Sequence, residues 1–594
     1  MAYAALNTYA FFEAGDLTPL LRFAALNRSA LPGRTRGGLK PAPAGPAYSP
    51  RRNKLRAPLK AEPERNPHCA PAAGSIQMLR ADPGEGAGGA KLWTKQAQAT
   101  RNRILHIRSE RGSAVQGHSF RERTVVDQRA KEAPRPAQQE TAAPGSARPK
   151  ARIAYPILQR KPLRLSEVPA LLRNPVGRKR LRRTILALAW PIVSRLAILY
   201  RRTLARKTRV VAVVGSFGKG SACSALRATL HSPARFHPDV NFGAALALRV
   251  LNIRPGERYA VIEVGVSRPG QMALFSKVIR PDVVVATCIG SEHNTSFQTL
   301  ETTRHEKAEM LRALPPSGLA VLNGDDPNTR WMASQTRARV LTYGFGESND
   351  VRASDARIEW PQGTRFTLHA SGQRREMRIG LLGWPMVYSA LAAAAVGLAE
   401  GLDLEAIAAA LESLKPRHGR LEPVALANGA MLLCDEYKGP LETVDAALDV
   451  FGEIPAKRRI IVMGEVSELA EKTGDTYRRL GERMAQLAQK IIFVGRRKVL
   501  SAFRRGAARG GLGPGAIVHV RRGIRPAVEA LQNDLGPGDV VLIKGRSSQS
   551  LSRIRLALAG RTVRCELEEC TTNQVSCDTC PMLERGWEGK KVAM

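Results

Sequence analysis

The chain has 594 residues, of which 92 are Lys or Arg and 52 are Asp or Glu, so its formal net charge is +40. Hydrophobic residues make up 43% of the sequence, which excludes a wholly disordered chain and allows two to four domains of about 100–200 residues each. Residues 1–210 carry 41 basic and 12 acidic residues. The charge therefore belongs mostly to the N-terminal third and is no argument by itself for nucleic-acid binding.

The N-terminal region is rich in Ala, Pro, Arg, Gly and Gln, and residues 1–150 show no sustained helical or strand periodicity. Such a segment buries too little apolar area to offset its conformational entropy, so we expect residues 1–177 to be a disordered basic region. An alternative is that translation starts downstream, for example at Met78. The absence of a signal-like apolar run near the start and the scattered cysteines favour a cytoplasmic setting.

The next segment, residues 178–206, differs in texture. An apolar run of 17 residues, from Thr184 to Tyr200, has arginines and lysines crowded on both sides. The run is shorter than the roughly 20 residues of a spanning helix, whereas basic flanks are typical of a helix that lies on an anionic membrane surface. Such a helix would hold the protein at the periphery of the inner membrane. The alternative is a helix packed on the following domain.

From Val210 onward, short β-branched runs alternate with helical stretches, which predicts an α/β fold with mostly parallel sheets. A central domain over residues 207–420 has expected strands at 210–214, 259–264, 283–286 and 319–322, an antiparallel excursion at 351–380 and a helix at 389–402. A smaller Rossmann-like domain over residues 421–562 has expected strands at 431–433, 459–463, 490–494, 517–520 and 540–543. A Cys-containing tail, residues 563–594, follows.

A glycine-rich loop directly follows the first expected strand. It reads Gly215-Ser216-Phe217-Gly218-Lys219-Gly220-Ser221, and the sequence after it, 222–230, predicts a helix. A buried strand, a glycine turn and a helix N-terminus form an anion site, where a lysine neutralises phosphate oxygens. The loop departs from G-x4-G-K-[ST], because Val213 replaces the first glycine. The candidate ATP-binding residues are Gly215, Ser216, Gly218, Lys219, Gly220 and Ser221; the alternative is a plain turn with an exposed lysine.

A series of short motifs continues in order after this loop. They are 259–265, 268–270, 280–282, 287–290, His293, Lys307, 322–326, 419–421, 435–437, 464–469 and 544–545. In this order and spacing, residues 207–560 resemble the Mur ligase superfamily, and most of all its UDP-N-acetylmuramoyl-tripeptide–D-alanyl-D-alanine ligases. The resemblance implies a P-loop ATPase domain, a C-terminal Rossmann-like domain and an ATP- and Mg²⁺-dependent carboxylate–amine ligase of peptidoglycan-type biosynthesis. Its substrates would be a small carboxylic acid and an amino acid or peptide.

The resemblance also implies metal-binding and catalytic roles. Glu263 and Ser221 would hold a first Mg²⁺, whose preferred ligands are hard oxygens. His293 and Lys307 would serve the second, with Lys307 carbamylated so that it becomes an anion. Lys219 would act on the phosphates of ATP. The alternatives are a solvated glutamate at a strand end and a histidine with an ordinary polar role.

Further nucleotide contacts follow from the same resemblance. Arg420, at the joint between the two domains, would approach the γ-phosphate when the domains close. Asn323 and Asp326 would contact the nucleotide, and Asp435 would meet the ribose. Simple turn chemistry is the alternative for Asn323 and Asp326.

Three departures limit the resemblance. Residues 383–390 lack the His and Asn of the family's adenine segment, and residues 434–440 alter the segment on the amine side. Residues 1–206 offer no evident counterpart of the UDP-sugar-binding domain. Two alternatives therefore stay open: a non-catalytic nucleotide-binding scaffold, and a membrane-associated ligase of the γ-glutamyl-polymer type. A nucleic-acid partner is not expected, because no aromatic residues interleave with the basic ones.

The tail carries a possible zinc site. Four cysteines, with one C-x2-C pair among them, could supply four thiolates to a structural Zn²⁺. The alternatives are reactive or disulfide-forming thiols and an inert tail. The four are Cys565, Cys570, Cys577 and Cys580.

Overall fold

The computed structural model describes residues 168–172, 175–234, 243–292, 294–469, 473–570, 576–587 and 589. All of them belong to one compact unit, residues 92–594. Most of the basic region expected to be disordered lies outside the described residues. Its last part does not follow that expectation, because α4 (Val168–Leu172) and the start of α5 (Pro175–Arg202) are helical.

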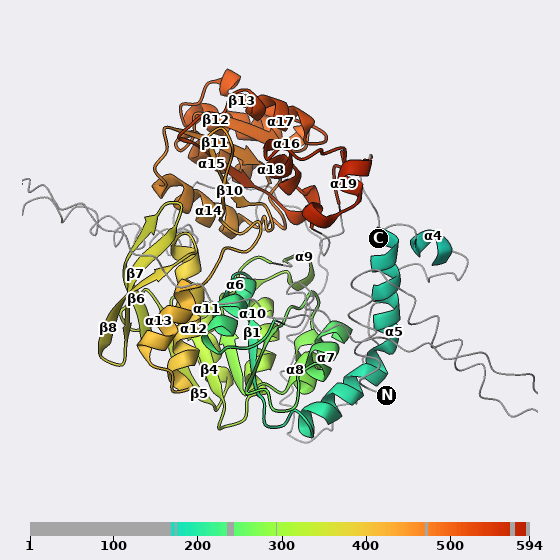
Figure 1. Cartoon of the computed structure of the whole chain (residues 1–594), viewed down its shortest axis with the longest axis vertical. Coiled ribbons are helices and arrows are strands. Elements are labelled where there is room, and N and C mark those ends of the chain that lie inside the picture. The colour runs from blue at the N-terminus through green and yellow to red at the C-terminus, as the bar shows by residue number, and fades with distance from the viewer. Residues whose placement is uncertain are drawn as a thin grey trace, which may run out of the picture. The chain divides into compact units, whose positions relative to one another are not determined.

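An eight-stranded mixed sheet forms the first half of the described chain (Figure 1), with the order β2-β1-β3-β4-β5-β6-β7-β8. Neighbouring strands from β2 to β6 in this order pair in parallel, whereas β6 with β7 and β7 with β8 pair antiparallel, as expected for 351–380. The four strands expected first are present, and β5 was not expected. The strands are β1 (Arg209–Val214), β2 (Tyr259–Glu263), β3 (Val283–Ala286), β4 (Leu319–Asn323), β5 (Arg339–Gly344), β6 (Val351–Glu359), β7 (Gly363–Ala370) and β8 (Gln373–Ile379).

Helices cover both faces of this sheet, because successive side chains of a buried strand point to opposite sides. Val211 and Val213 of β1 pack with α6, α12 and α13, whereas Val210, Ala212 and Val214 pack with α5, α7, α8 and α10. The covering helices are α6 (Lys219–Thr229), α7 (Gly243–Leu251), α8 (Gln271–Ile279), α10 (Leu300–Arg312), α12 (Trp384–Ala399) and α13 (Leu404–Glu412). Short helices α9 (Asn294–Phe297), α11 (Pro327–Trp331) and η3 (Met332–Gln335) connect them.

A six-stranded sheet forms the second half, with the order β13-β12-β11-β14-β10-β9. All its pairs are parallel except β9 with β10. The strands are β9 (Glu422–Ala425), β10 (Met431–Asp435), β11 (Arg458–Met463), β12 (Lys490–Val494), β13 (Ile517–Val520) and β14 (Asp539–Lys544). Five of the six match the expected ones, so the α/β fold class with two largely parallel sheets is confirmed.

The helices of this half also lie on both faces of the sheet. One core contains α14, α15 and α16, and the other contains α17 and α18. Their bounds are α14 (Leu441–Glu453), α15 (Thr473–Ala485), α16 (Arg497–Arg509), α17 (Arg525–Gln532) and α18 (Ser552–Leu558). The remaining elements are η4 (Pro514–Ala516), η5 (Ser547–Gln549), η6 (Cys577–Thr579) and α19 (Met582–Arg585).

Candidate functional site

The glycine-rich loop joins β1 to α6, and two of its glycines are required by the backbone. Gly215 and Gly218 have φ of +141° and +77°, values that other residues rarely adopt. A Cβ on Gly215 would lie 2.0 Å from the Thr287 hydroxyl oxygen. Gly218 is the N-cap of α6 and supplies no side-chain cap. The first N–H groups of α6 are therefore directed toward a ligand site, with the positive end of the helix dipole behind them.

Lys219 lies within this loop rather than on the surface. Its Nζ donates to the carbonyl oxygens of Gly215 and Ser216, at 2.8 and 2.9 Å, and to Glu292 Oε2 at 3.0 Å. Burial acts to lower the pKa of Lys219, but the carboxylates of Glu292 and Glu263 outweigh it and raise the pKa. The ammonium therefore stays charged, which a phosphate-binding lysine requires. The alternative of an exposed turn lysine is wrong.

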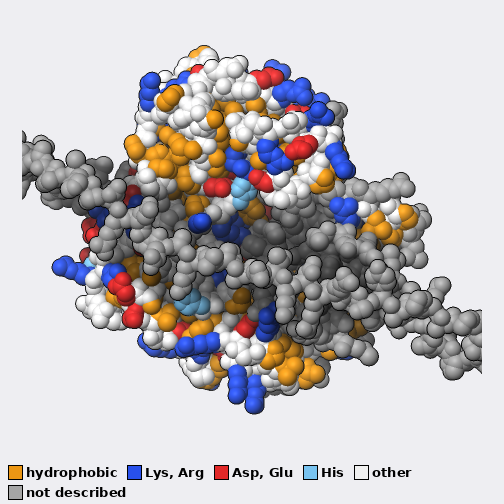
Figure 2. Space-filling model, in the orientation of Figure 1, with side chains coloured by type: hydrophobic (Ala, Val, Ile, Leu, Met, Phe, Trp, Pro, Cys, Tyr) orange, Lys and Arg blue, Asp and Glu red, His pale blue; other side chains and the backbone are white. Residues whose placement is uncertain are grey.

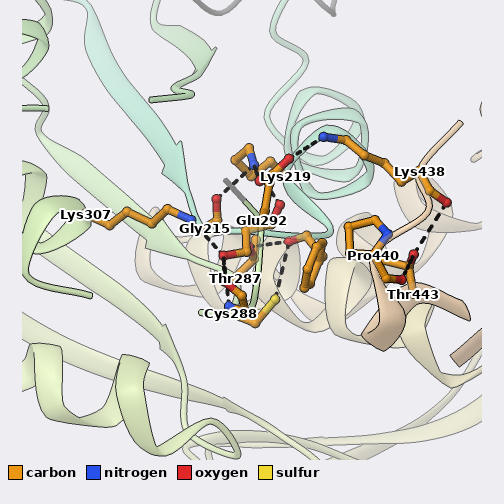
Figure 3. A network of polar contacts seen from close by, with 12 residues as sticks. Gly215, Lys219, Thr287, Cys288, Glu292, Lys307, Lys438, Pro440 and Thr443 are labelled. Carbon is orange, nitrogen blue, oxygen red and sulfur yellow. Dashed lines mark hydrogen bonds and ion pairs between the residues drawn. The ribbon is translucent and has the colours of Figure 1, made fainter. Parts of the chain in front are cut away.

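Lys307 reaches the same loop from α10, as Figure 3 shows. It is buried, and its Nζ donates to Ser216 Oγ at 2.8 Å. Burial first, and then the neighbouring Lys219 ammonium, lowers the pKa of Lys307 to about 7. The pKa values of these two adjacent lysines are thus shifted in opposite directions. Lys219 keeps its proton, whereas near pH 7 a large fraction of Lys307 is a neutral amine.

Glu263 ends β2 beside the loop, and its side chain is buried. A Cβ placed on Gly220 would lie 1.9 Å from Arg417 Nη1 and 3.5 Å from Glu263 Oε2. The Arg417 guanidinium and the Glu263 carboxylate therefore meet directly above Gly220. Arg417 belongs to the joint between the two sheets, and no motif in the sequence distinguishes it.

The joint arginine that the sequence did single out, Arg420, lies elsewhere. Its guanidinium stacks on the ring of Tyr437 at 4.3 Å from the ring centroid. The backbone N–H of Arg420 donates to the backbone carbonyl of Arg417. Asp435 is nearby and buried, where it accepts from Leu421 N at 3.2 Å and pairs with Lys544 at 2.9 Å. The structure thus brings Arg417 to the phosphate loop and leaves Arg420 against the second sheet.

Asn323 and Asp326 make turn and capping hydrogen bonds at the end of β4. Asn323 Oδ1 accepts from Asp325 N. Asp326 caps α11 through Asn328 N and also accepts from Ile289 N at 2.7 Å. These contacts fix the loop after β3 against the loop after β4.

Glu292 links the phosphate loop to the second sheet, and sequence reasoning did not find it. One of its carboxylate oxygens accepts from Lys219 and the other from Lys438, which precedes α14 (Figure 3). Next to it, Ser291 donates from both N and Oγ to Glu442 of α14, at 2.8 and 2.7 Å. The neighbouring His293, expected at the second Mg²⁺, lies outside the described residues.

A pocket of about 520 Å³ opens beside this link. Its lining combines Glu292 with residues of the second sheet's loops, including the altered segment 437–440. Its lining holds three cations, Lys438, Arg496 and Arg546, against two carboxylates, Glu292 and Glu468. Lys438 pairs with Glu292, and both arginines pair with Glu465, but Arg496 remains largely exposed. The pocket can therefore receive a small molecule that carries a carboxylate.

The residues beside the phosphate loop fit the first of the two expected Mg²⁺ sites. Mg²⁺ in phosphate-transfer sites is held by one or two carboxylates together with substrate phosphates, so Glu263 and the Ser221 hydroxyl beside the phosphate loop suffice. Within the described ranges, no three His, Cys, Asp or Glu side chains are grouped to hold a metal ion. At the second expected Mg²⁺ site, Lys307 cannot bind a metal cation while its side chain is a protonated ammonium.

The same observation corrects the expectation for the tail. Cys565, Cys570, Cys577 and Cys580 all lie in the described part of the chain, yet they do not form a metal-binding group. The buried Cys565 instead accepts from the Arg553 guanidinium. Among the described residues, no three of these thiols are grouped to hold one ion, so the expected zinc site is not found.

Two family models match the chain over these same elements. The Mur ligase middle domain matches residues 202–397, and the Mur ligase, glutamate ligase domain matches residues 419–547. The UDP-N-acetylmuramoyl-tripeptide–D-alanyl-D-alanine ligase of Mycobacterium tuberculosis is 30% identical over 370 residues, which cover 59% of this chain and 72% of the relative. The Bacillus subtilis enzyme of the same name is 27% identical, and 58% and 75% are covered.

Solved structures agree on the fold. MurF from Acinetobacter baumannii is 24% identical, with a TM-score of 0.56, and 63% of this chain and 81% of that chain are covered. The MurF ligase from Thermotoga maritima, in complex with ADP, is 22% identical with a TM-score of 0.52, and 62% and 82% are covered. The chain belongs to the Mur ligase family of ATP-dependent enzymes that form amide bonds.

Proposed function

We propose that this protein joins a carboxylate of a peptidoglycan precursor to the amino group of an amino acid or dipeptide, in the cytoplasm. One observation carries the proposal. Lys219, Glu263, Lys307 and Arg417 converge on the uncapped start of α6, and Glu292 links that point to a cationic pocket. The phosphate site and the amine site are thus neighbours, as a two-step ligation requires.

In the first step, the substrate carboxylate takes the γ-phosphoryl group of ATP to form an acyl phosphate. Such a transfer depends on positioning and on neutralising the phosphate oxygens. The N–H groups of α6 and the Lys219 ammonium hold the phosphates, and Arg417 adds a second cation over Gly220. Glu263 and Ser221 would hold Mg²⁺, which when bound would neutralise charge on the phosphate oxygens.

Lys307 is proposed to act as a carbamate, an expectation taken from the family resemblance. A neutral amine is the form that reacts with CO₂, and burial keeps a large fraction of Lys307 neutral near pH 7. Carbamylation of this neutral amine releases one proton to solvent and places an anion beside the Lys219 ammonium, which attracts it. The carbamate oxygens, together with His293, would then serve as ligands for a second Mg²⁺.

In the second step, the amine attacks the acyl carbonyl, and inorganic phosphate leaves. The cationic pocket beside Glu292 is proposed to hold the amine substrate through its carboxylate, with the exposed Arg496 as the first contact. Glu292 lies between that pocket and the phosphate loop. The named relatives use D-alanyl-D-alanine, a dipeptide with one free carboxylate, and a molecule of this class fits a pocket of about 520 Å³.

Nucleotide recognition is proposed to involve Asn323, Asp326 and Asp435 after the two sheets approach, with Arg420 moving with the second sheet. The segment at the expected adenine site differs from the family pattern, and its Tyr388 donates to Asp325 at 2.8 Å. Tyr388 thereby fixes the loop after β4 and leaves the neighbouring Trp384 as the aromatic candidate for stacking.

The test is release of ADP and phosphate by the full-length chain with Mg²⁺ and ATP. Substrates are pooled amino acids, D-alanyl-D-alanine and UDP-muramoyl peptides, added as acid alone, amine alone and both. Lys219→Ala and Glu263→Ala should abolish release, whereas Lys277→Ala, at an exposed lysine of α8, should not. Release that needs both acid and amine supports the proposal. ATP binding without release under any combination would instead support the scaffold alternative.

A further inference from the structure

Helix α5 has a buried side and an opposite, exposed apolar side. One side carries Trp190, Ser194, Ala197 and Arg201, all buried. Trp190 contacts Phe275 of α8 at 6.0 Å between ring centroids, and Ala197 lies in the core that α7 and α8 share. This side is an ordinary packing face.

The other side exposes five large aliphatic residues at a helical spacing. At 100° per residue, these five centre about 180° from the buried side, so they form one stripe that faces away from the domain. Leu188 and Ile192, in the middle of the stripe, are 68% and 67% exposed. The stripe consists of Ile185, Leu188, Ile192, Leu196 and Leu199. Of the seven large hydrophobic residues exposed in the described part of the chain, five belong to it.

The charges beside the stripe have one sign. Arg195 and Arg202 project on one edge and Arg178 on the other, by the same helical geometry, and all three are exposed. Residues 175–209 contain no Asp or Glu. In the view of Figure 2, hydrophobic and basic side chains lie together where Figure 1 labels α4, next to the start of α5.

The sign of these charges decides between occupants. A second copy would bring two sets of basic edges together, and residues 1–174 as a whole, with 30 basic and 12 acidic residues, carry a net charge of the same sign as these edges. An apolar stripe with basic edges matches an anionic lipid surface, where aliphatic side chains enter the boundary of the acyl chains and arginines meet lipid phosphates. Charge complementarity therefore selects the bilayer.

The buried side shows how the helix meets that surface. Residues Arg180–Arg202 are long and apolar enough to cross a membrane by length and composition. However, Arg201 is 5% exposed and donates to the carbonyls of Ile279, Ala205 and Arg280 and to Asp282. A spanning helix would have to break these bonds. A helix parallel to the surface keeps them and exposes only the stripe.

We infer that the outer stripe of α5 docks this protein onto an anionic membrane surface, with the helix lying in the plane of the headgroups. The inference is independent of the ligase activity. It assigns the 178–206 segment both of its expected roles: one face packs on the domain and the opposite face binds lipid.

Co-sedimentation of the full-length chain with vesicles tests the inference. The vesicles contain either phosphatidylcholine alone or phosphatidylcholine with 30% phosphatidylglycerol. We expect at least tenfold tighter binding to the anionic vesicles, and release by alkaline carbonate. The double variant Leu188→Gln/Ile192→Gln should weaken binding at least tenfold, and Arg195→Gln/Arg202→Gln several-fold. The matched control Leu300→Gln, at an exposed leucine of α10, should bind like the wild type.

Four results would overturn the inference. Equal binding by the wild type and the Leu188→Gln/Ile192→Gln variant would show that basic residues elsewhere bind the lipid. Absence of vesicle binding would show that the stripe is covered. Resistance to carbonate would indicate a spanning helix. A dimer in light scattering that the same variant converts to a monomer, without vesicles, would identify a second copy as the occupant.

Discussion

Both sheets hold a buried lysine near the carboxyl ends of their parallel strands, but the two lysines have different surroundings. Lys544, the last residue of β14, is fully buried and pairs with Asp435 at 2.9 Å, and Thr443 Oγ1 lies 3.2 Å from its Nζ. Lys219 shares the carboxylate of Glu292 with Lys438. Lys544 has its own carboxylate partner, whereas Lys219 shares its carboxylate partner with a second lysine.

The comparison teaches that position at a strand end does not by itself make a ligand site. Around the phosphate loop, Lys219 and Arg417 add positive charge to the N–H groups of α6, whose N-cap Gly218 supplies no side-chain cap. Around Lys544, side chains and carbonyls already fill every direction. Only the surroundings of Lys219 therefore favour a bound anion. Substitution of Lys219 should affect substrate binding, whereas substitution of Lys544 should affect stability.

The largest expected effect on activity is that of Lys219→Ala. Loss of a charged donor at a developing phosphate charge costs about 10³-fold in rate. ADP release at saturating substrate should fall by that factor. A variant with normal turnover would remove Lys219 from the site. Circular dichroism of the same sample should show an unchanged fold.

Lys544→Met should have the opposite character. It leaves the Asp435 carboxylate buried without a cation, which costs about 3–5 kcal/mol of stability. The denaturant midpoint should fall, and the double variant Asp435→Asn/Lys544→Met should recover part of the loss. A midpoint equal to that of the wild type would contradict the structural role.

Arg417→Ala should lower the rate of ADP release by about 10²-fold, because one of the cations over the phosphate loop is lost. Arg417→Lys should recover part of this rate. The control is Lys415→Ala, at an exposed lysine of the same joint, which should leave the rate within twofold of the wild type, roughly the scatter expected for a surface change. If Arg417→Ala and Lys415→Ala behave alike, Arg417 has no part in the reaction.

The smallest effect is a pH dependence of stability caused by Lys307. Its pKa of about 7 in the folded protein lies below the ordinary lysine value of 10.5. Between these values the unfolded chain binds a proton that the folded chain does not. Stability therefore rises with pH, by about 1 kcal/mol per unit at most, and this gain is lost as the pH falls through 7. The Tm of Lys307→Met in CO₂-free buffer should lack this slope, whereas Lys277→Met should keep it.

Local patterns in the sequence predicted most of the fold. Five strands of the second sheet and four of the first stand out because buried parallel strands are near-continuous apolar runs, most of them rich in valine or isoleucine. β5 was missed because its run, Arg339–Gly344, has only three branched aliphatic or β-branched residues in a polar setting. The phosphate loop was also found locally, since its glycines and lysine adjoin a strand.

The rest of the site depends on segments that are distant in sequence. Glu292 gains its role from Lys219 and Lys438, which lie 73 and 146 residues away. Arg417 gains its role from Gly220 and Glu263, and no motif contains all three. The same limit explains the zinc expectation, because cysteine spacing alone does not show whether four thiols point to one centre.

The shared carboxylate of Glu292 has a consequence for the order of events. One carboxylate neutralises only one of its two lysines, so a phosphate that binds Lys219 weakens the hold of that lysine on Glu292 and leaves the carboxylate to Lys438. Lys438 precedes α14 and lines the pocket for the amine. Binding of a phosphate at the loop would thereby change the charge balance at the pocket proposed for the amine, through the Glu292 side chain alone. In the Glu292→Gln variant, we expect the affinity for the amine substrate not to depend on whether ATP is bound.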